Sequence, residues 1–160
     1  MKAATVREIK QELSTLSQPE MIELILRLSK FKKDNKELLT YLLYEAGDEA
    51  AYIQSVKDEI DFQFTEINLT SYYFMKKTIR KILRQVKKYI RYSQKKETEA
   101  ELLIYFCNKL LDLNPPIKKN TVLTNLFWRQ KEIATKAVSN LHEDIQFDFK
   151  GSLDELELDN

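Results

Sequence analysis

Very few residues of this chain belong to the types that carry out chemistry. Histidine and cysteine each occur once, as His142 and Cys107. One of each is too few for a zinc site of the ordinary type. Cys107 follows the apolar run LLIYF, which predicts a small buried side chain rather than a nucleophile. His142 stands near the expected end of a helix, where an imidazolium interacts favourably with the helix dipole.

Acidic residues gather between positions 58 and 66, so a carboxylate metal site has to be considered. The four residues are Asp58, Glu59, Asp61 and Glu66. Two-metal sites in helical bundles combine Glu with a His three residues away, and no His is near these acids. We interpret the cluster as a solvated helix face. The sequence therefore predicts no metal, no cofactor and no catalytic residue, and a protein that is not an enzyme. A substrate pocket built from tyrosines is the remaining enzymatic alternative.

A basic segment is the feature that points furthest toward function. Residues 76–96 hold ten Lys or Arg and no acid, in a chain whose net charge is +1. On a helical wheel six apolar residues between Met75 and Ile90 fall within about 100°, which predicts a buried stripe. The cations form a band roughly 140° wide beside this stripe. The candidate polyanion-binding or partner-binding residues are Lys76, Arg80, Arg84, Lys87, Lys88, Arg91 and Lys95.

Folding alone does not account for this band, because like charges four residues apart destabilise a helix. Residues 143–160 are acidic, with a net charge of −6, and residues 1–66 carry −4. Either acidic segment could lie against the band, the band could face solvent without a ligand, or an external polyanion such as nucleic acid could bind it. We favour a solvated or internally compensated band over a nucleic-acid site. A membrane surface is a weaker alternative, because the apolar stripe is needed for the core.

Composition indicates an all-α protein. Among 160 residues there are only 2 Gly and 3 Pro, which leaves few residues for tight hairpin turns. The single cysteine favours a reducing compartment. No apolar signal segment follows the first Met, and the longest apolar run, residues 102–107, is too short to span a bilayer. We therefore expect a cytoplasmic protein with no membrane segment.

Capping patterns predict about seven helices. Ser, Thr or Asp followed three residues later by Glu marks helix starts at Thr5, Ser17, Asp34 and Thr98. Gly47 is expected to end the third helix, and the prolines after Asn114 to end the sixth. The expected helices cover approximately residues 5–14, 17–32, 34–47, 48–67, 72–95, 98–113 and 121–144. Short links favour an antiparallel bundle or a short α-α superhelix. We expect one domain over residues 1–145 and a flexible acidic tail over 146–160.

The opening TVREIKQELSTLSQPEMIELILRLSKFKKDNKELLTYL resembles a family of bacterial helical proteins of unknown function. That family shares a short helix, a segment of the form LSxxELIELILxL and a charged turn, with Met21 in place of one Leu here. The resemblance covers mainly residues 5–43 and implies an all-helical fold. Residues 5–31 also resemble the helix-loop-helix of SAP-type DNA-binding modules, with Pro19 in a loop where that module usually has glycine.

These observations favour a non-enzymatic helical scaffold or protein-interaction module, which binds an unknown protein or a second copy of itself. The alternative is a nucleic-acid-binding protein that uses the basic helix 76–96.

Overall fold

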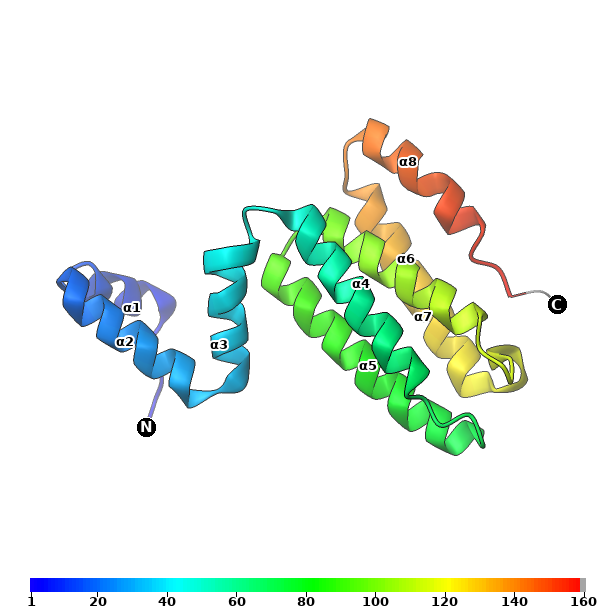
Figure 1. Cartoon of the computed structure of the whole chain (residues 1–160). Helices are drawn as coiled ribbons and strands as arrows, with labels where there is room; N and C mark the ends of the chain where they lie inside the picture. The colour runs from blue at the N-terminus through cyan, green and yellow to red at the C-terminus, as the bar shows by residue number, and fades with distance from the viewer. Residues whose placement is uncertain (159–160) are drawn as a thin grey trace. The chain divides into compact units, whose positions relative to one another are not determined.

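Helices make up all the regular secondary structure that the computed structural model describes, over residues 1–158 (Figure 1). The α-helices are α1 (Val6–Leu13), α2 (Gln18–Phe31), α3 (Lys33–Thr40), α4 (Glu49–Thr65), α5 (Tyr72–Ser93), α6 (Lys96–Leu111), α7 (Thr121–Ser139) and α8 (Glu143–Asp154). A π-helical turn, Tyr41–Glu45, follows α3, and a 3-10 turn, Ile117–Lys119, precedes α7. The predicted all-α class is therefore confirmed, with eight α-helices in place of about seven.

The chain forms two compact units, Met1–Tyr44 and the remainder from Glu45 onward. This organisation differs from the expected single domain over 1–145. The first unit consists of α1, α2 and α3. In the second, α4 to α7 lie side by side and alternate in direction, so they form an antiparallel bundle (Figure 1). Helix α8 packs on α7.

Helix α6 is the centre of the second unit. It contacts α4, α5 and α7, and eight of its residues are buried. Phe106 is fully buried and packs edge-on against Phe64 of α4, with ring centroids 5.8 Å apart. The predicted stripe of α5 is buried as well, from Met75 at its start to Ile90 near its end. Packing against α6 therefore fixes which face of α5 is turned away from solvent.

Two of the predicted capping boxes are present. Thr5 and Glu8 open α1, and Ser17 and Glu20 open α2, each pair with reciprocal side-chain and backbone bonds. Asp48 caps α4 by accepting a hydrogen bond from the Ala51 amide at 3.1 Å. These caps involve only residues close in sequence, which explains why the pattern finds them.

The other two predicted boxes are wrong. Helix α3 begins at Lys33 and has no side-chain cap, which places Asp34 inside its first turn. Helix α6 begins at Lys96, two residues before the predicted cap Thr98. The Thr98 hydroxyl instead donates to Glu49 Oε1 at 2.6 Å, and Glu101 pairs with Lys57 of α4 at 2.7 Å. Both side chains join α6 to α4, so tertiary packing overrides the local pattern here.

Two predicted helix ends also differ. Gly47 has no positive φ, and a π-helical turn precedes it. Helix α7 stops at Ser139 rather than near residue 144, and α8 then crosses the expected domain boundary at 145. Residues 146–154 of the expected tail are thus helical, and Leu156 is fully buried. Residues 159 and 160 of that tail lie outside the described residues.

The buried stripe of α5 provides a test of the bundle. Ile82 is only 2% exposed, so Ile82→Ala is expected to destabilise the protein by about 2–5 kcal/mol through lost contacts and a residual cavity. Urea denaturation followed by circular dichroism measures this change. The exposed neighbour Lys81→Ala serves as the control and should stay within about 0.5 kcal/mol of the unmodified protein. A loss below about 1 kcal/mol for Ile82→Ala would contradict the packing of α5.

Candidate binding surfaces

Helix α5 carries the basic band and is fixed at both ends. Ser71 caps its start by accepting from the Phe74 amide, and Gln94 ends it in the left-handed conformation, with φ of 58°. Tyr72 at the first turn donates its hydroxyl to the Pro116 carbonyl at 2.8 Å. Near the other end, the Tyr89 carbonyl accepts from the hydroxyl of Tyr52 in α4 at 2.9 Å. The band is therefore held on a rigid helix rather than on a loop.

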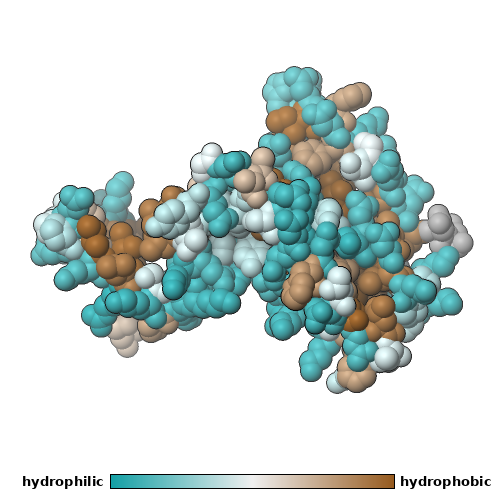
Figure 2. All heavy atoms as spheres, viewed as in Figure 1, coloured by the Kyte–Doolittle hydropathy of each residue, from teal (hydrophilic) through white to brown (hydrophobic). Residues whose placement is uncertain are grey.

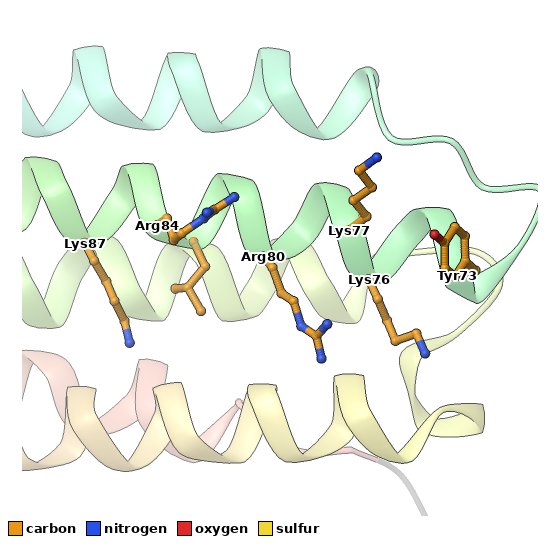
Figure 3. Close-up of a pocket in the computed structure, with 7 residues that line it drawn as sticks. Tyr73, Lys76, Lys77, Arg80, Arg84 and Lys87 are labelled. Carbon is orange, nitrogen blue, oxygen red and sulfur yellow. The ribbon is translucent and has the colours of Figure 1, made fainter. Parts of the chain in front are cut away.

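Four of the seven predicted site residues line one groove on α5. These residues are Lys76, Arg80, Arg84 and Lys87, and three further residues of α5 complete the lining: Tyr73, Lys77 and Leu83 (Figure 3). The groove has a volume of about 660 Å³. Lys76, Arg80 and Lys87 extend toward the α7 side, whereas Lys77 and Arg84 extend toward the α4 side (Figure 3). These seven lining residues form the basic groove.

The other three predicted residues do not line the basic groove. Lys95 pairs with Glu49 Oε2 of α4 at 2.9 Å. The same carboxylate accepts hydrogen bonds from the Ser93 and Thr98 hydroxyls, so Lys95 belongs to a polar cluster that joins α4, α5 and α6. The Lys88 ammonium lies 5.7 Å from the centre of the Tyr89 ring, and Arg91 is exposed on the last turn of α5.

Cations alone provide the charge of the basic groove. No ion pair joins Lys76, Lys77, Arg80, Arg84 or Lys87 to any residue in the part of the chain that the structure describes. Partial burial, and then the charge of Arg129 on α7, lower the pKa of Lys87, and Glu99 opposes this effect more weakly. The positive form of Lys87 is therefore disfavoured, first because the side chain is partly buried and then because a second cation lies near it.

The described part of the acidic C-terminal segment supplies no ion-pair partner to the basic groove. Phe149 and Leu153 of α8 pack against Ala100, Ala137 and Val138. The buried Leu156 accepts a hydrogen bond at its carbonyl from Lys131 at 2.7 Å. No ion pair among residues 1–158 joins an acid of residues 143–158 to the groove cations Lys76, Lys77, Arg80, Arg84 and Lys87. The segment packs on α6 and α7 through its apolar residues.

A second surface lies on the first unit and is apolar. Helices α1, α2 and α3 contain no buried residue, and Tyr41 is the buried residue of this unit. All seven large apolar residues of α2 are exposed, from 37% for Met21 to 76% for Phe31. Figure 2 shows apolar side chains, in brown, along this unit. Sequence reasoning predicted α2 but missed this surface, because an apolar helix was assumed to have a core to pack into.

A groove of about 750 Å³ runs along α2. Its lining combines apolar and charged side chains: Leu16, Glu20, Glu23, Leu24, Leu26, Arg27 and Lys30. On a helical wheel the four charged residues fall within about 80° of one another. They therefore form one charged strip, with Leu24 and Leu26 on its two sides.

The residues considered for catalysis have structural surroundings. Burial raises the pKa of the Cys107 thiol to about 12, and its Sγ lies 3.9 Å from the Phe127 carbonyl oxygen. His142 caps α8, because its Nδ1 accepts from the Asp144 amide at 3.3 Å. It therefore stands at a helix start, and the predicted role at a helix C-terminus is wrong.

One member of the acidic cluster at positions 58–66 joins two helices. Asp61 of α4 accepts from the Tyr105 hydroxyl at 2.7 Å and lies 3.2 Å from Lys109 Nζ, both on α6. Burial alone would raise the pKa of Asp61, but the bonds from Tyr105 and Lys109 lower it overall. Burial and the Asp61 hydrogen bond raise the pKa of Tyr105 to about 12. No group of three His, Cys, Asp or Glu residues within 1–158 is placed to hold a metal ion.

Comparisons with models of protein families, with curated proteins and with solved structures found no match to this chain. The resemblances to a bacterial family of unknown function and to SAP-type modules therefore stay predictions. Over the residues that the structure describes, no helix combines the length and apolar character needed to cross a membrane.

Burial of Cys107 provides a test of its structural role. A thiol with a pKa of about 12 is almost entirely protonated near neutral pH, and the thiolate is the reactive form. Alkylation by iodoacetamide should therefore be about a thousandfold slower in the folded protein than in the chain unfolded in guanidinium. Mass spectrometry measures the rate, and Cys107→Ser gives the background. A folded-state rate within about tenfold of the unfolded one would contradict this assignment.

Proposed function

We propose that this chain works by binding rather than by catalysis, as a protein-interaction module whose first unit associates with a second copy of the chain. The observation that carries the proposal is the missing core of that unit. A segment of 44 residues whose helices α1 to α3 bury no side chain gains little from the hydrophobic effect. Units near this size usually depend on disulfides, metals or association with another surface.

The energy available from covering α2 is large compared with the stability of a small unit. Fully burying a Leu, Ile, Phe or Met side chain stabilises by about 1.5–3 kcal/mol. Three of the seven exposed apolar residues of α2, Leu24, Leu26 and Phe31, lie beside the charged strip on the helical wheel. Covering that face would therefore stabilise the unit by several kcal/mol. Contiguous exposed apolar surface of this kind is typical of protein-protein interfaces.

The charges of α2 favour a second copy in an antiparallel arrangement. Glu23 and Arg27 lie two residues on either side of Ile25, and Glu20 and Lys30 lie five. A twofold axis that crosses the charged strip at the level of residue 25 therefore places each acid opposite a base of the second copy. A parallel pairing in register would bring like charges together. Self-complementary patches of this kind are what twofold interfaces require, and Leu24 and Leu26 on both sides of the strip would be buried with it.

The proposal that the chain is not an enzyme is supported by its two most reactive residue types. The Cys107 thiol is buried with a raised pKa, and the His142 ring is used as a helix cap. Both side chains have structural partners that account for their positions.

Sedimentation velocity of the full chain tests self-association. The unmodified protein is expected to form a dimer in a concentration-dependent manner. Glu23→Arg should weaken the dimer about tenfold, because two attractive pairs become two repulsive ones at surface sites worth some tenths of a kcal/mol each. The swap Glu23→Arg/Arg27→Glu should restore it. Glu66→Arg, an exposed change in the second unit, is the control.

Two results would contradict the antiparallel pairing. One is a chain that stays monomeric at every concentration. The other is a double variant that dimerises no better than Glu23→Arg. Circular dichroism of each variant shows whether its helices are retained, so a weakened dimer can be separated from an unfolded first unit.

A further inference from the structure

We infer that the basic groove on α5 binds the phosphate backbone of a single-stranded nucleic acid, with Tyr73 as a stacking platform for one base at its end. This inference goes beyond the proposed self-association and rests on a different unit of the chain. Its starting point is the juxtaposition in one groove of five cations, one exposed aromatic ring and no carboxylate.

The spacing of the cations fits an extended polyanion. Lys76, Arg80 and Lys87 follow one side of α5, and Lys77 and Arg84 the other (Figure 3). From residue 76 to residue 87 the helix rises about 16 Å, so the positive charge is spread along a line. Two of the five are arginines, whose planar guanidinium groups can form two parallel hydrogen bonds to one phosphate.

The charge state of the groove also favours an anionic ligand. Its five cations make no ion pair within residues 1–158, and the acidic segment packs elsewhere. Like charges four residues apart, such as Lys76–Arg80–Arg84, repel one another in the free protein. A bound phosphate chain relieves this repulsion and releases its own counterions, which is the main driving force for protein binding to nucleic acid.

The shape and the aromatic ring distinguish a single strand from other polyanions. Tyr73 is 68% exposed and is held edge-on by Phe74, with ring centroids 5.4 Å apart. Exposed rings beside a cationic groove are how proteins bind unpaired bases, because every base offers a face for stacking. A duplex keeps its bases stacked inside and has none to offer to Tyr73. An anionic membrane would require exposed apolar side chains between the cations, but Leu83 is only 8% exposed.

Fluorescence anisotropy with labelled oligothymidine and oligouridine tests this inference on the full chain. With all five cations neutralising phosphates, the logarithm of affinity should fall with the logarithm of salt at a slope of about −3.5. Affinity should therefore drop about a hundredfold between 50 and 200 mM salt. The variant Arg80→Gln/Arg84→Gln/Lys87→Gln should reduce the slope to about −1.4. The matched control Lys119→Gln/Lys136→Gln/Lys150→Gln removes the same charge from exposed positions outside the groove and should leave the slope unchanged.

Tyr73→Leu separates stacking from general electrostatic attraction. Loss of one base-aromatic stack should weaken single-strand binding about 5- to 100-fold without changing the salt slope. Duplex DNA of the same length should bind more weakly than the single strand, and Tyr73→Leu should not affect it.

Several outcomes would overturn the inference. The first is that no oligonucleotide binds at low salt. The second is that the groove variant and its control lose the same amount of affinity. The third is that duplex DNA or phosphatidylserine vesicles bind more tightly than the single strand. Glu23→Arg in the first unit keeps the groove intact. At a concentration where this variant is monomeric, binding to the oligonucleotide with the same salt slope shows that the two proposals succeed or fail separately.

Discussion

Burial of α6 between three helices is the constraint on which the rest of the second unit depends. Eight of its 16 residues are buried, and α4, α5 and α7 all contact it. Each neighbour must then turn its own apolar face inward. For α5 this requirement decides the position of every cation, because the stripe from Met75 to Ile90 takes the inner face. Packing of the apolar stripe therefore places the cations of the basic groove on the outer face of α5.

The repulsion within the band is offset only where packing brings an acid to it. At the end of α5, Glu49 of α4 accepts bonds from Ser93, Lys95 and Thr98, which links three helices through one carboxylate. Along the groove no ion pair forms among residues 1–158. Glu99 acts on Lys87 more weakly than burial and Arg129, which lower the pKa of this lysine overall. One part of the band therefore stabilises the bundle, and the cations of the basic groove make no ion pair among residues 1–158. Lys95 thus forms an ion pair with Glu49, whereas Arg80 and Arg84 line the basic groove, although all three belong to the same basic band in the sequence.

Sequence predicted well those features that depend on one helix at a time. The α5 stripe follows from periodicity, and the Thr5 and Ser17 caps from residues three positions apart. Sequence failed where a distant partner decides the outcome. Thr98 contacts Glu49 rather than capping α6, and the apolar residues Phe149 and Leu153 pack α8 onto the bundle despite the acids between them. Of the candidate site, the wheel predicted the cations but not the role of Tyr73, because one exposed ring among many aromatics carries no periodic signal. The apolar surface of α2 was missed because a sequence shows which residues are apolar, but not whether a core exists to receive them.

The two units solve opposite problems. The second unit has an extensive buried core and a groove lined by cations, whereas the first has charges of both signs on α2 and few buried residues. Each lacks what a different class of partner supplies: anions for the groove, and apolar surface for α2. Joining two chains through α2 would also bring two basic grooves into one molecule. A strand long enough to reach both would bind the second groove at a high effective concentration, so overall affinity can exceed that of one groove by about a hundredfold or more without any new contact. If each groove has modest affinity, a long strand that reaches both grooves would still bind strongly. A short strand reaches only one groove and would bind weakly.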